Sequence, residues 1–418
     1  MKHTIRTTTL SALLLLALLL NFSACSEIHA TDLMEGITAN EVSVSAANDD
    51  GTFRTDFAVR LLQASYAENG EGENILLSPF SLQLTLAMLA NGADGQSLKE
   101  LEAVVGGGMT VQELNEALFA YRTGLPSGDK CKLAIANSIW FRDEANRFLP
   151  TKEFLQLNAD YYGAQAYKCD FNDKRTLKEI NQWVSDQTNG KIEEILDEIS
   201  EDAVMFLLNA LSFDAEWSTP YEKCDVSQET FTAANGEKQT AEMMHSTESR
   251  YIQNERATGF FKSYSGNQYS FVALLPNEDI SLDEYIRTLT AAELSSALSG
   301  SEQNTLVSVR MPKFKNRYNF RANSALTSMG LHGIWRGGDF SKLCEIEEVH
   351  VSEIVQKTYI CVDEKGTRAG AASKVELAGG GFAAIVNHSV RLDRPFLYMI
   401  VDNASLTPIF IGTVTTLR

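Results

Sequence analysis

The 418-residue sequence is short of basic residues. It has 36 lysines and arginines against 55 aspartates and glutamates, a formal net charge of −19. Nucleic acids and anionic membrane surfaces are bound through basic patches, so this balance argues against both as partners. It also argues against a heparin-type polyanion as a cofactor. Solubility alone explains the acidic excess.

The motifs of common enzyme sites are missing as well. The six histidines are dispersed, and the chain has no GxSxG, no HExxH and no phosphate-binding glycine loop. The glycines at Gly379 to Gly381 do not open a helix, and His245 and His388 are interpreted as surface or satisfied core histidines. We therefore expect no catalytic residue, no metal and no cofactor.

Cysteines are few and do not form a paired pattern. Without Cys25, five widely separated cysteines remain and no CxxC occurs, which is neither a disulfide framework nor a zinc site. We expect buried free thiols, with one disulfide as the alternative. The remaining cysteines are Cys131, Cys169, Cys224, Cys344 and Cys361.

The N-terminus lacks an apolar run long enough to span a membrane. Lys2 and Arg6 precede the apolar run Leu10 to Leu20, which has the length of a signal-peptide core. The run ends in Phe22-Ser23-Ala24-Cys25. Small residues before a cysteine resemble a bacterial lipoprotein cleavage box, although Phe22 stands where an aliphatic residue is usual.

We therefore expect residues 1–25 to be a lipoprotein signal peptide, with lipidation of Cys25. Ordinary secretion, with cleavage near Ala24 or a later alanine, is the alternative. Residues 26–52 are polar and acidic without clear periodicity, which predicts a flexible tether.

Residues 53–418 contain no repeat and no second linker, so we expect one large domain although the length alone suggests two or three. Its N-terminal half is helix-rich. Phe57 to Ala67 has helical spacing, and Ser78-Pro79 predicts the start of a buried helix that ends at Asn91-Gly92. Strands are expected at Leu133–Phe141 and Ala203–Phe213, residues 224–320 are strand-rich, and a helix is expected near Ala322–Met329.

One stretch near the C-terminus, Glu364 to Leu377, has a strict alternation. Thr367, Ala369, Ala371 and Ser373 fall on one face, which is small and mostly apolar, while charged residues fall on the other. Few residues here are β-branched, so the segment can be a strand when a sheet receives it and a loop otherwise. A Gly/Ala linker is the alternative, but a linker does not need two-fold patterning.

Glu364-Lys365-Gly366-Thr367 followed by Ala, Gly and Ser resembles the hinge of the reactive-centre loop of serpins. Other runs resemble the family in the same order along residues 53–418. They are Asn74–Ser81, Asn181–Val184, Thr188–Ile192, Asn209, Trp217, Ser270–Pro276, Val307–Phe314, Asp393–Ile400 and Ile409–Gly412. The resemblance also implies that Val349–Asp363 is the strand that leads into the loop. One departure is Gln356-Lys357, where family members usually have His-Lys.

The resemblance implies an α+β serpin fold: a helix-rich N-terminal half packed on a large mixed main β-sheet, with further sheets and an exposed reactive-centre loop. It implies a metastable inhibitor, not an enzyme. A protease cuts the loop, forms an acyl-enzyme, and is trapped when the cleaved hinge inserts into the main sheet. The hinge residues are Glu364, Gly366, Thr367, Ala369, Ala371 and Ser373; the sheet-opening residues are Ser78, Ser81, Asn209, Trp217 and Gln356.

Family spacing from Glu364 places the cleaved bond between Gly380 and Gly381, whereas spacing from Pro395 gives about Ala384. The window Ala378 to Ala384 holds small residues and Phe382 but no basic residue, which disfavours a trypsin-like target. Elastase-like or subtilisin-like serine proteases are favoured. Chymotrypsin-like enzymes acting at Phe382, papain-like cysteine proteases, and a non-inhibitory serpin-fold binding protein remain alternatives.

The expected partner is therefore a target protease in a covalent complex, and the membrane is reached only through the lipid anchor. We expect a monomer in the bacterial cell envelope, anchored at the outer membrane or cell surface, or secreted.

Overall fold

A computed structural model describes residues 30–44, 51–69, 72–143, 149–201, 203–335, 337–344, 350–367 and 386–417. Several sequence-predicted residues lie outside these ranges. They are Cys25 and the remainder of the signal peptide, the hinge residues Ala369, Ala371 and Ser373, and the whole cleavage window Ala378–Ala384 with Gly380, Gly381 and Phe382.

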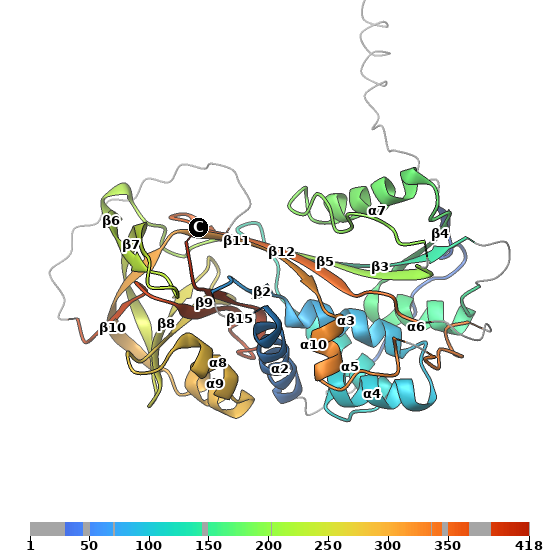
Figure 1. The fold of residues 1–418 in the computed structure, drawn as a ribbon, viewed down its shortest axis with the longest axis horizontal. Coiled ribbons are helices and arrows are strands. Elements are labelled where there is room, and N and C mark those ends of the chain that lie inside the picture. The colour runs from blue at the N-terminus through green and yellow to red at the C-terminus, as the bar shows by residue number, and fades with distance from the viewer. Residues whose placement is uncertain are drawn as a thin grey trace, which may run out of the picture.

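The described chain alternates helices and strands in the N-terminal half and becomes strand-rich after β5 (Figure 1). The helices are α2 (Thr52–Asn69), α3 (Pro79–Ala90), α4 (Gly95–Gly106), α5 (Val111–Gly124), α6 (Lys152–Tyr162), α7 (Lys174–Gln187), the 3-10 helix η1 (Lys223–Asp225), α8 (Leu282–Thr288), α9 (Ala291–Ser299) and α10 (Asn323–Ser328). The strands are β1 (Thr31–Asp32), β2 (Leu76–Leu77), β3 (Cys131–Arg142), β4 (Gln165–Cys169), β5 (Met205–Glu216), β6 (Val226–Thr232), β7 (Lys238–Gln253), β8 (Ala257–Ser263), β9 (Tyr269–Pro276), β10 (Glu302–Pro312), β11 (Phe314–Arg321), β12 (Val355–Val362), β13 (Gly366–Thr367), β14 (His388–Arg391), β15 (Phe396–Asp402) and β16 (Pro408–Val414).

The main sheet has seven strands in the order β1-β4-β3-β5-β13-β12-β11. Helix α7 covers its outer face, while α3 and α6 lie beneath it (Figure 1). A small apolar cluster joins α7 to the outer face of the main sheet. In it, Ile180, Trp183 and Val184 of α7 pack with Phe206 and Leu208 of β5. Since α7 buries only one face, it rests on the sheet rather than inside the core.

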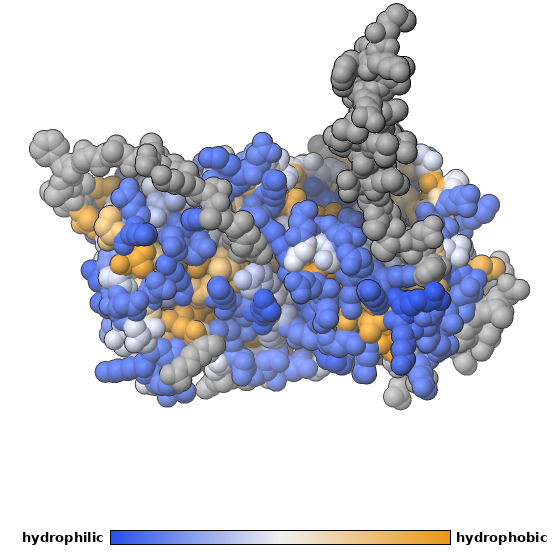
Figure 2. All heavy atoms as spheres, turned by 90° about the horizontal axis from the view of Figure 1, so that it is seen from above, coloured by the Kyte–Doolittle hydropathy of each residue, from blue (hydrophilic) through white to orange (hydrophobic). Residues whose placement is uncertain are grey.

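The second sheet has nine strands in the order β14-β10-β7-β8-β9-β15-β16-β2, with β6 paired to β7. Every residue of β9, β15 and β16 is buried, so these strands form the centre of the larger apolar core. The core continues beneath the main sheet through α3, which is buried at all twelve positions. Seen from above, the visible face of the molecule is mainly hydrophilic, with apolar residues in small separate patches (Figure 2).

The helix predicted after Ser78 is present as α3, with Ser78 at the N-cap position and Pro79 in the first turn. The Ser78 side chain makes no cap hydrogen bond and instead donates to the carbonyl of Ile409 at 3.0 Å. The helix ends before Asn91, as its sequence indicates. The Val307–Phe314 strand is divided between β10 and β11 at Lys313, and β12 is shorter than Val349–Asp363.

The tether prediction for residues 26–52 is wrong where the structure describes them. Thr31 and Asp32 pair with Lys168 and Tyr167 of β4, so this segment forms an edge of the main sheet. Further along, the backbone amide of Asn40 donates to Asp160 of α6 at 2.7 Å. The polar composition hid this docking, because a short edge strand needs backbone hydrogen bonds more than apolar side chains.

The five cysteines beyond Cys25 lie in the described ranges and form no disulfide. Three of them, Cys131, Cys169 and Cys344, are buried, and burial raises the pKa of Cys131 and of Cys169 to about 12. Within the described residues, no helix has the length and apolarity needed to cross a membrane.

Candidate functional site

The two residues of β13 lie between β5 and β12 and are antiparallel to both. Thr367 is opposite Ala215 of β5 and Val362 of β12, and Gly366 is opposite Glu216. Residues 363–365 make the reversal from β12, with the Asp363 amide donating to the Gly366 carbonyl at 3.0 Å. The start of the predicted hinge is therefore already a short central strand. We call this end of the sheet the hinge end, and the end at Met205 the far end.

An aromatic pair holds the hinge end. Trp217 donates from its backbone amide to the Lys365 carbonyl at 2.9 Å and from its indole to the Asp363 carbonyl at 2.8 Å. The Trp217 ring stacks on Tyr264, with centroids 4.6 Å apart. The Tyr264 hydroxyl in turn hydrogen-bonds the Thr367 hydroxyl, and the side chains of Thr367 and Tyr264 are 2% and 0% exposed.

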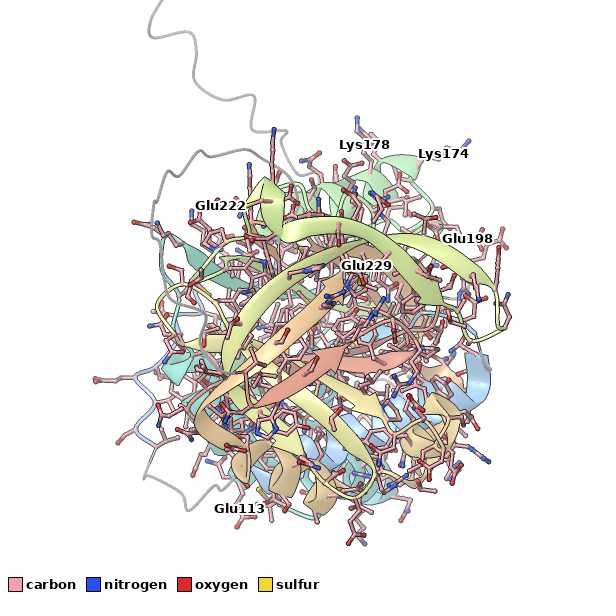
Figure 3. All side chains as sticks on the ribbon, turned by 90° about the vertical axis from the view of Figure 1, so that its left-hand side faces the viewer. Glu113, Lys174, Lys178, Glu198, Glu222 and Glu229 are labelled. Carbon is pink, nitrogen blue, oxygen red and sulfur yellow. The ribbon has the colours of Figure 1, made fainter. Side chains whose placement is uncertain are left out.

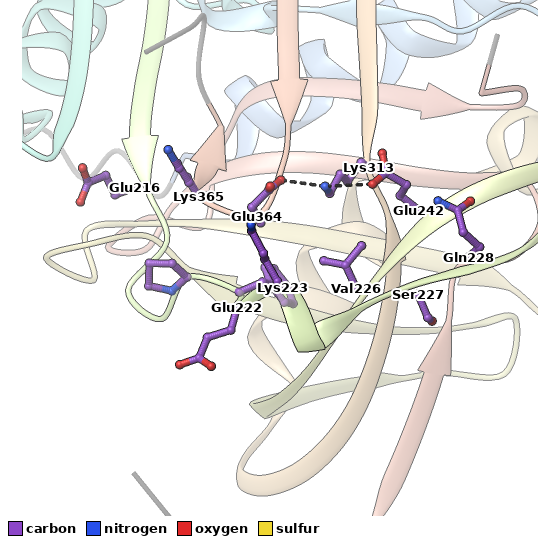
Figure 4. Close-up of a pocket in the computed structure, with 12 residues that line it drawn as sticks. Glu216, Glu222, Lys223, Val226, Ser227, Gln228, Glu242, Lys313, Glu364 and Lys365 are labelled. Atoms are coloured by element: carbon purple, nitrogen blue, oxygen red, sulfur yellow. Dashed lines mark hydrogen bonds and ion pairs between the residues drawn. The ribbon is translucent and has the colours of Figure 1, made fainter. Parts of the chain in front are cut away.

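Glu364 takes part in an ion pair that was not predicted. Lys313 Nζ lies 2.9 Å from Glu364 Oε2 and 3.3 Å from Glu242 Oε1, so one ammonium bridges the hinge and β7 (Figure 4). These three side chains line a surface hollow of about 520 Å³, which also includes Lys365 and Lys223. Lys313 is 22% exposed and Glu364 is 40% exposed, so water screens the pair only in part.

The pKa values of this pair follow from its contacts. Burial alone would raise the pKa of Glu364, but hydrogen bonds from its own amide and from Lys313 outweigh burial and lower that pKa. For Lys313, burial acts to lower the pKa, and the two carboxylates outweigh it and raise that pKa. Both side chains are therefore held in their charged forms.

Beyond Thr367, β5 and β12 lie next to each other but are not paired by backbone hydrogen bonds among the described residues, although both strands are described throughout. A hollow of about 10 Å³ lies on this seam, lined by Leu211 to Phe213 of β5, Tyr359 to Cys361 of β12, Thr367, and Lys191 and Ile192 from the segment after α7. Among the described strands, the backbone groups of β5 and β12 along this seam are thus not paired with each other.

Four of the five predicted sheet-opening residues gather at the middle of the sheet above α3. The Gln356 amide accepts from the Ser78 backbone N–H and donates to the Ser78 carbonyl, both at 2.9 Å. Ser81 donates to Asn209, whose amide donates to Asn137 at 2.6 Å. The structure places Trp217 apart from them, at the hinge end. Each contact uses a small neutral side chain, so it can break and form again without leaving a buried charge.

Comparison with known proteins decides the family. The family model described as Serpin (serine protease inhibitor) matches residues 53–417. The chain belongs to the serpin family. The native state of tengpin, a thermophilic serpin, superimposes with a TM-score of 0.86 at 43% identity, covering 93% of this chain and all of that one. The latent state of tengpin gives a TM-score of 0.78 at 41% identity, covering 91% and 100%.

A serpin-like protein of Thermococcus kodakarensis that is described as uncharacterized is 29% identical, over 82% of this chain and 80% of that protein. These findings confirm the predicted family and its α+β serpin fold. They support protease inhibition as the general function of this serpin.

Sequence reasoning missed two residues of the site. Lys313 stands in the run Met-Pro-Lys-Phe, which was interpreted only as a strand, and nothing local marks it as the partner of Glu364. Tyr264 lies in a turn between β8 and β9, and no pattern there indicates a contact with Thr367. Among the described residues, no three potential metal ligands come together.

Proposed function

We propose that this serpin is a suicide inhibitor that traps an elastase-like or subtilisin-like serine protease as an acyl-enzyme. The observation that carries the proposal is the position of β13, which has entered the main sheet between β5 and β12. A strand that starts there can continue along the unpaired seam once the loop is cut. Strand addition to a sheet is a known mode of peptide binding, and serpin loop insertion is one of its standard examples.

Continuing the observed register tests the fit of the remaining hinge. With Thr367 opposite Ala215, the next inward positions place Ala369 opposite Phe213 and Ser373 opposite Asn209. On the other side, the pairing of Thr367 with Val362 places Ser373 opposite Gln356. Ser373 would thus enter between Asn209, which bonds Ser81 of α3, and Gln356, which bonds Ser78 just before α3, so a small hydroxyl can find a partner there.

The same register sets the reach of the inserted strand. Residue 377 would face Met205, the first residue of β5, at the far end of the sheet. A bond cut after Gly380 lies three residues further on, past the last partner. The strand from Thr367 to residue 377 has ten residue steps, so its insertion moves the attached protease about 33 Å along the sheet. This supports the Gly380–Gly381 bond over the alternative near Ala384, because less unpaired chain would then tether the protease.

The chemistry needs no catalytic group of the inhibitor. The serine hydroxyl of the protease attacks the carbonyl carbon of Gly380, the peptide bond breaks, and Gly381 leaves with a new amino group. Water must then hydrolyse the ester for the protease to escape. Insertion competes with that step, so the outcome depends on how fast the hinge enters the sheet.

The proposed target follows from the cleavage window, which offers small residues and Phe382 but no lysine or arginine. Incubation with pancreatic elastase or subtilisin, followed by a denaturing gel, tests the proposal. We expect a covalent band at the summed mass and, after nicking of the loop, a higher melting temperature. Cleavage without that band would favour a non-inhibitory serpin, and no reaction with elastase, subtilisin, chymotrypsin or papain would refute the trap.

We also propose that Cys25 carries a lipid and that the protein acts as a monomer at the bacterial envelope. Cys25 lies only five residues before Ala30, and Thr31 pairs at the far end of the main sheet through β4 and β3. Five residues reach at most about 18 Å. The anchor would therefore hold the far end near the membrane and present the hinge end outward. Labelling of cells with radioactive palmitate tests this, with Cys25→Ser as the control; equal labelling of both would contradict it.

A further inference from the structure

One carboxylate ties together four neighbouring strands of the second sheet. Glu229 of β6 accepts from His245 of β7 at 2.8 Å, from Arg310 of β10 at 3.0 Å, and from Ser227 at 2.9 Å. Its other oxygen lies 2.8 Å from Nη2 of Arg391 on β14. We call Glu229, His245, Arg310 and Arg391 the Glu229 cluster. Figure 3 shows Glu229 on the sheet face that is turned to the viewer.

The strand register explains why these side chains meet. Arg391 is opposite Arg310, and Arg310 is opposite His245, so the three stand in one row across β14, β10 and β7. Two guanidinium groups side by side repel each other unless an anion lies between them. Glu229 is that anion, and its side chain is only 11% exposed. Removing its charge would take away the carboxylate that contacts both guanidinium groups and leave Asp393 beside Arg391 alone.

Strand β14 has few other contacts: Val390 is buried in the core, and Arg391 Nε lies 3.1 Å from Asp393 Oδ2. The strand has four residues, lies at the edge of the sheet, and pairs only with β10 among the described strands. At its start, His388 stacks on Tyr251 with ring centroids 3.9 Å apart, and its Nε2 lies 3.0 Å from Glu302. The Glu302 side chain is 56% exposed, so this contact is screened by water more than the one at Arg391.

The release of β14 matters because β14 is the first strand after the loop. If the uncut loop filled the seam to the level of Met205, only ten steps would join residue 377 to Asn387. Ten steps reach at most about 36 Å. The segment from residue 377 to Asn387 would have to run back along β5, about 33 Å, and then pass around the sheet to Leu306. Asn387 donates its backbone amide to the Leu306 carbonyl. Insertion of an uncut loop therefore requires β14 to leave β10, whereas insertion of a cut loop does not.

We propose that the Glu229 cluster is a latch on β14, and that Glu229 sets how long this serpin stays active before it inserts its own uncut loop. The inference rests on the proposed function, because it concerns a competing fate of the same loop. Glu229 acts through Arg391 on the strand and is a positioning residue. It has no part in binding the protease or in the chemistry at the cut bond.

The test uses the full chain with Glu229→Gln, which keeps the side-chain shape and removes the charge. The uncut protein is incubated without protease, and its remaining capacity to form the covalent complex is followed with time. We expect capacity to be lost about five- to thirty-fold faster than in the wild type, the range for a partly buried ion-pair network. Fresh Glu229→Gln should trap protease with unchanged stoichiometry, because cut-loop insertion leaves β14 in place.

Two further variants separate a latch from general destabilisation. Glu302→Gln, the matched control on β10 that contacts His388 at the start of β14, should change the loss rate less than about two-fold. A disulfide between the paired residues Ser308 and Ser389, made by replacing both with cysteine in Glu229→Gln, should restore the wild-type rate when oxidised and not when reduced. Equal loss rates for Glu229→Gln and the wild type, or no restoration by the disulfide, would overturn the proposal.

Hydrogen exchange of residues 388–391 distinguishes a failed latch from a failed trap. If no protease forms a complex with the wild type, the proposed function is lost, but faster exchange of these amides in Glu229→Gln still supports the latch. If complexes form and exchange is unchanged, the trap stands and the latch is wrong.

Discussion

Replacing Thr367 by arginine tests whether the hinge must enter the sheet. Thr367 is 2% exposed, faces the buried hydroxyl of Tyr264, and is paired on both sides. An arginine there would lose one buried hydrogen bond, worth about 1 kcal/mol, and would place a charge in the core at a cost of several kcal/mol more. The hinge would then be expelled from the sheet.

We take the free-energy cost of placing arginine in the sheet as about 5 kcal/mol. If half of it raises the barrier to insertion, the insertion rate falls by about 70-fold, because each 1.4 kcal/mol of barrier changes a rate tenfold. Hydrolysis of the acyl-enzyme then wins, and Thr367→Arg should behave as a substrate. Titration against a fixed amount of elastase measures this: the molar ratio needed for full inhibition should rise at least about tenfold. Lys365→Ala, a change beside it in the surface hollow, is the control and should leave the ratio near that of the wild type. An arginine variant that traps protease as well as the wild type would refute the insertion model.

Three other changes have defined outcomes. In Gly366→Ala, the new Cβ would lie 2.0 Å from a backbone carbonyl oxygen of β5, so hydrogen exchange should show Thr367 released from the sheet; protection equal to wild type would contradict this. Glu364→Lys replaces an ion pair with repulsion at Lys313 and should lower the melting temperature by about 2–6 °C, measured by calorimetry with Glu364→Gln as an intermediate case. The pKa of Glu364 is lowered in the folded state from its ordinary value of 4.5. The charged Glu364 therefore stabilises the fold fully above pH 4.5, and this stabilisation is lost as the pH falls through the folded pKa. The difference in stability between the wild type and Glu364→Gln should vanish in acid. Asp160→Ala removes the acceptor for Asn40 and should expose the segment 33–44 to limited proteolysis, with the main body intact.

The sequence was most informative where a pattern repeats over a whole element. Helix α3 is apolar nearly all round, which predicted its burial, because exposing so many apolar side chains to water is unfavourable. Alternation over Glu364 to Leu377 indicated which hinge residues point inward, and Thr367, in strand β13 of the main sheet, is buried. The order of the motifs indicated the family.

Contacts between distant segments depended on the fold. Lys313 and Glu364 are 51 positions apart, and Tyr264 and Thr367 are 103 apart; neither pair leaves a periodic signal. The docking of Thr31 on β4 and the row of charges at Glu229 likewise arise from strand register, which local sequence does not specify. The chain by itself determined which residues are apolar, small or charged, and so which segments could be buried. Only the folded sheet decided which of them face one another, because that depends on how strands far apart in the sequence are aligned.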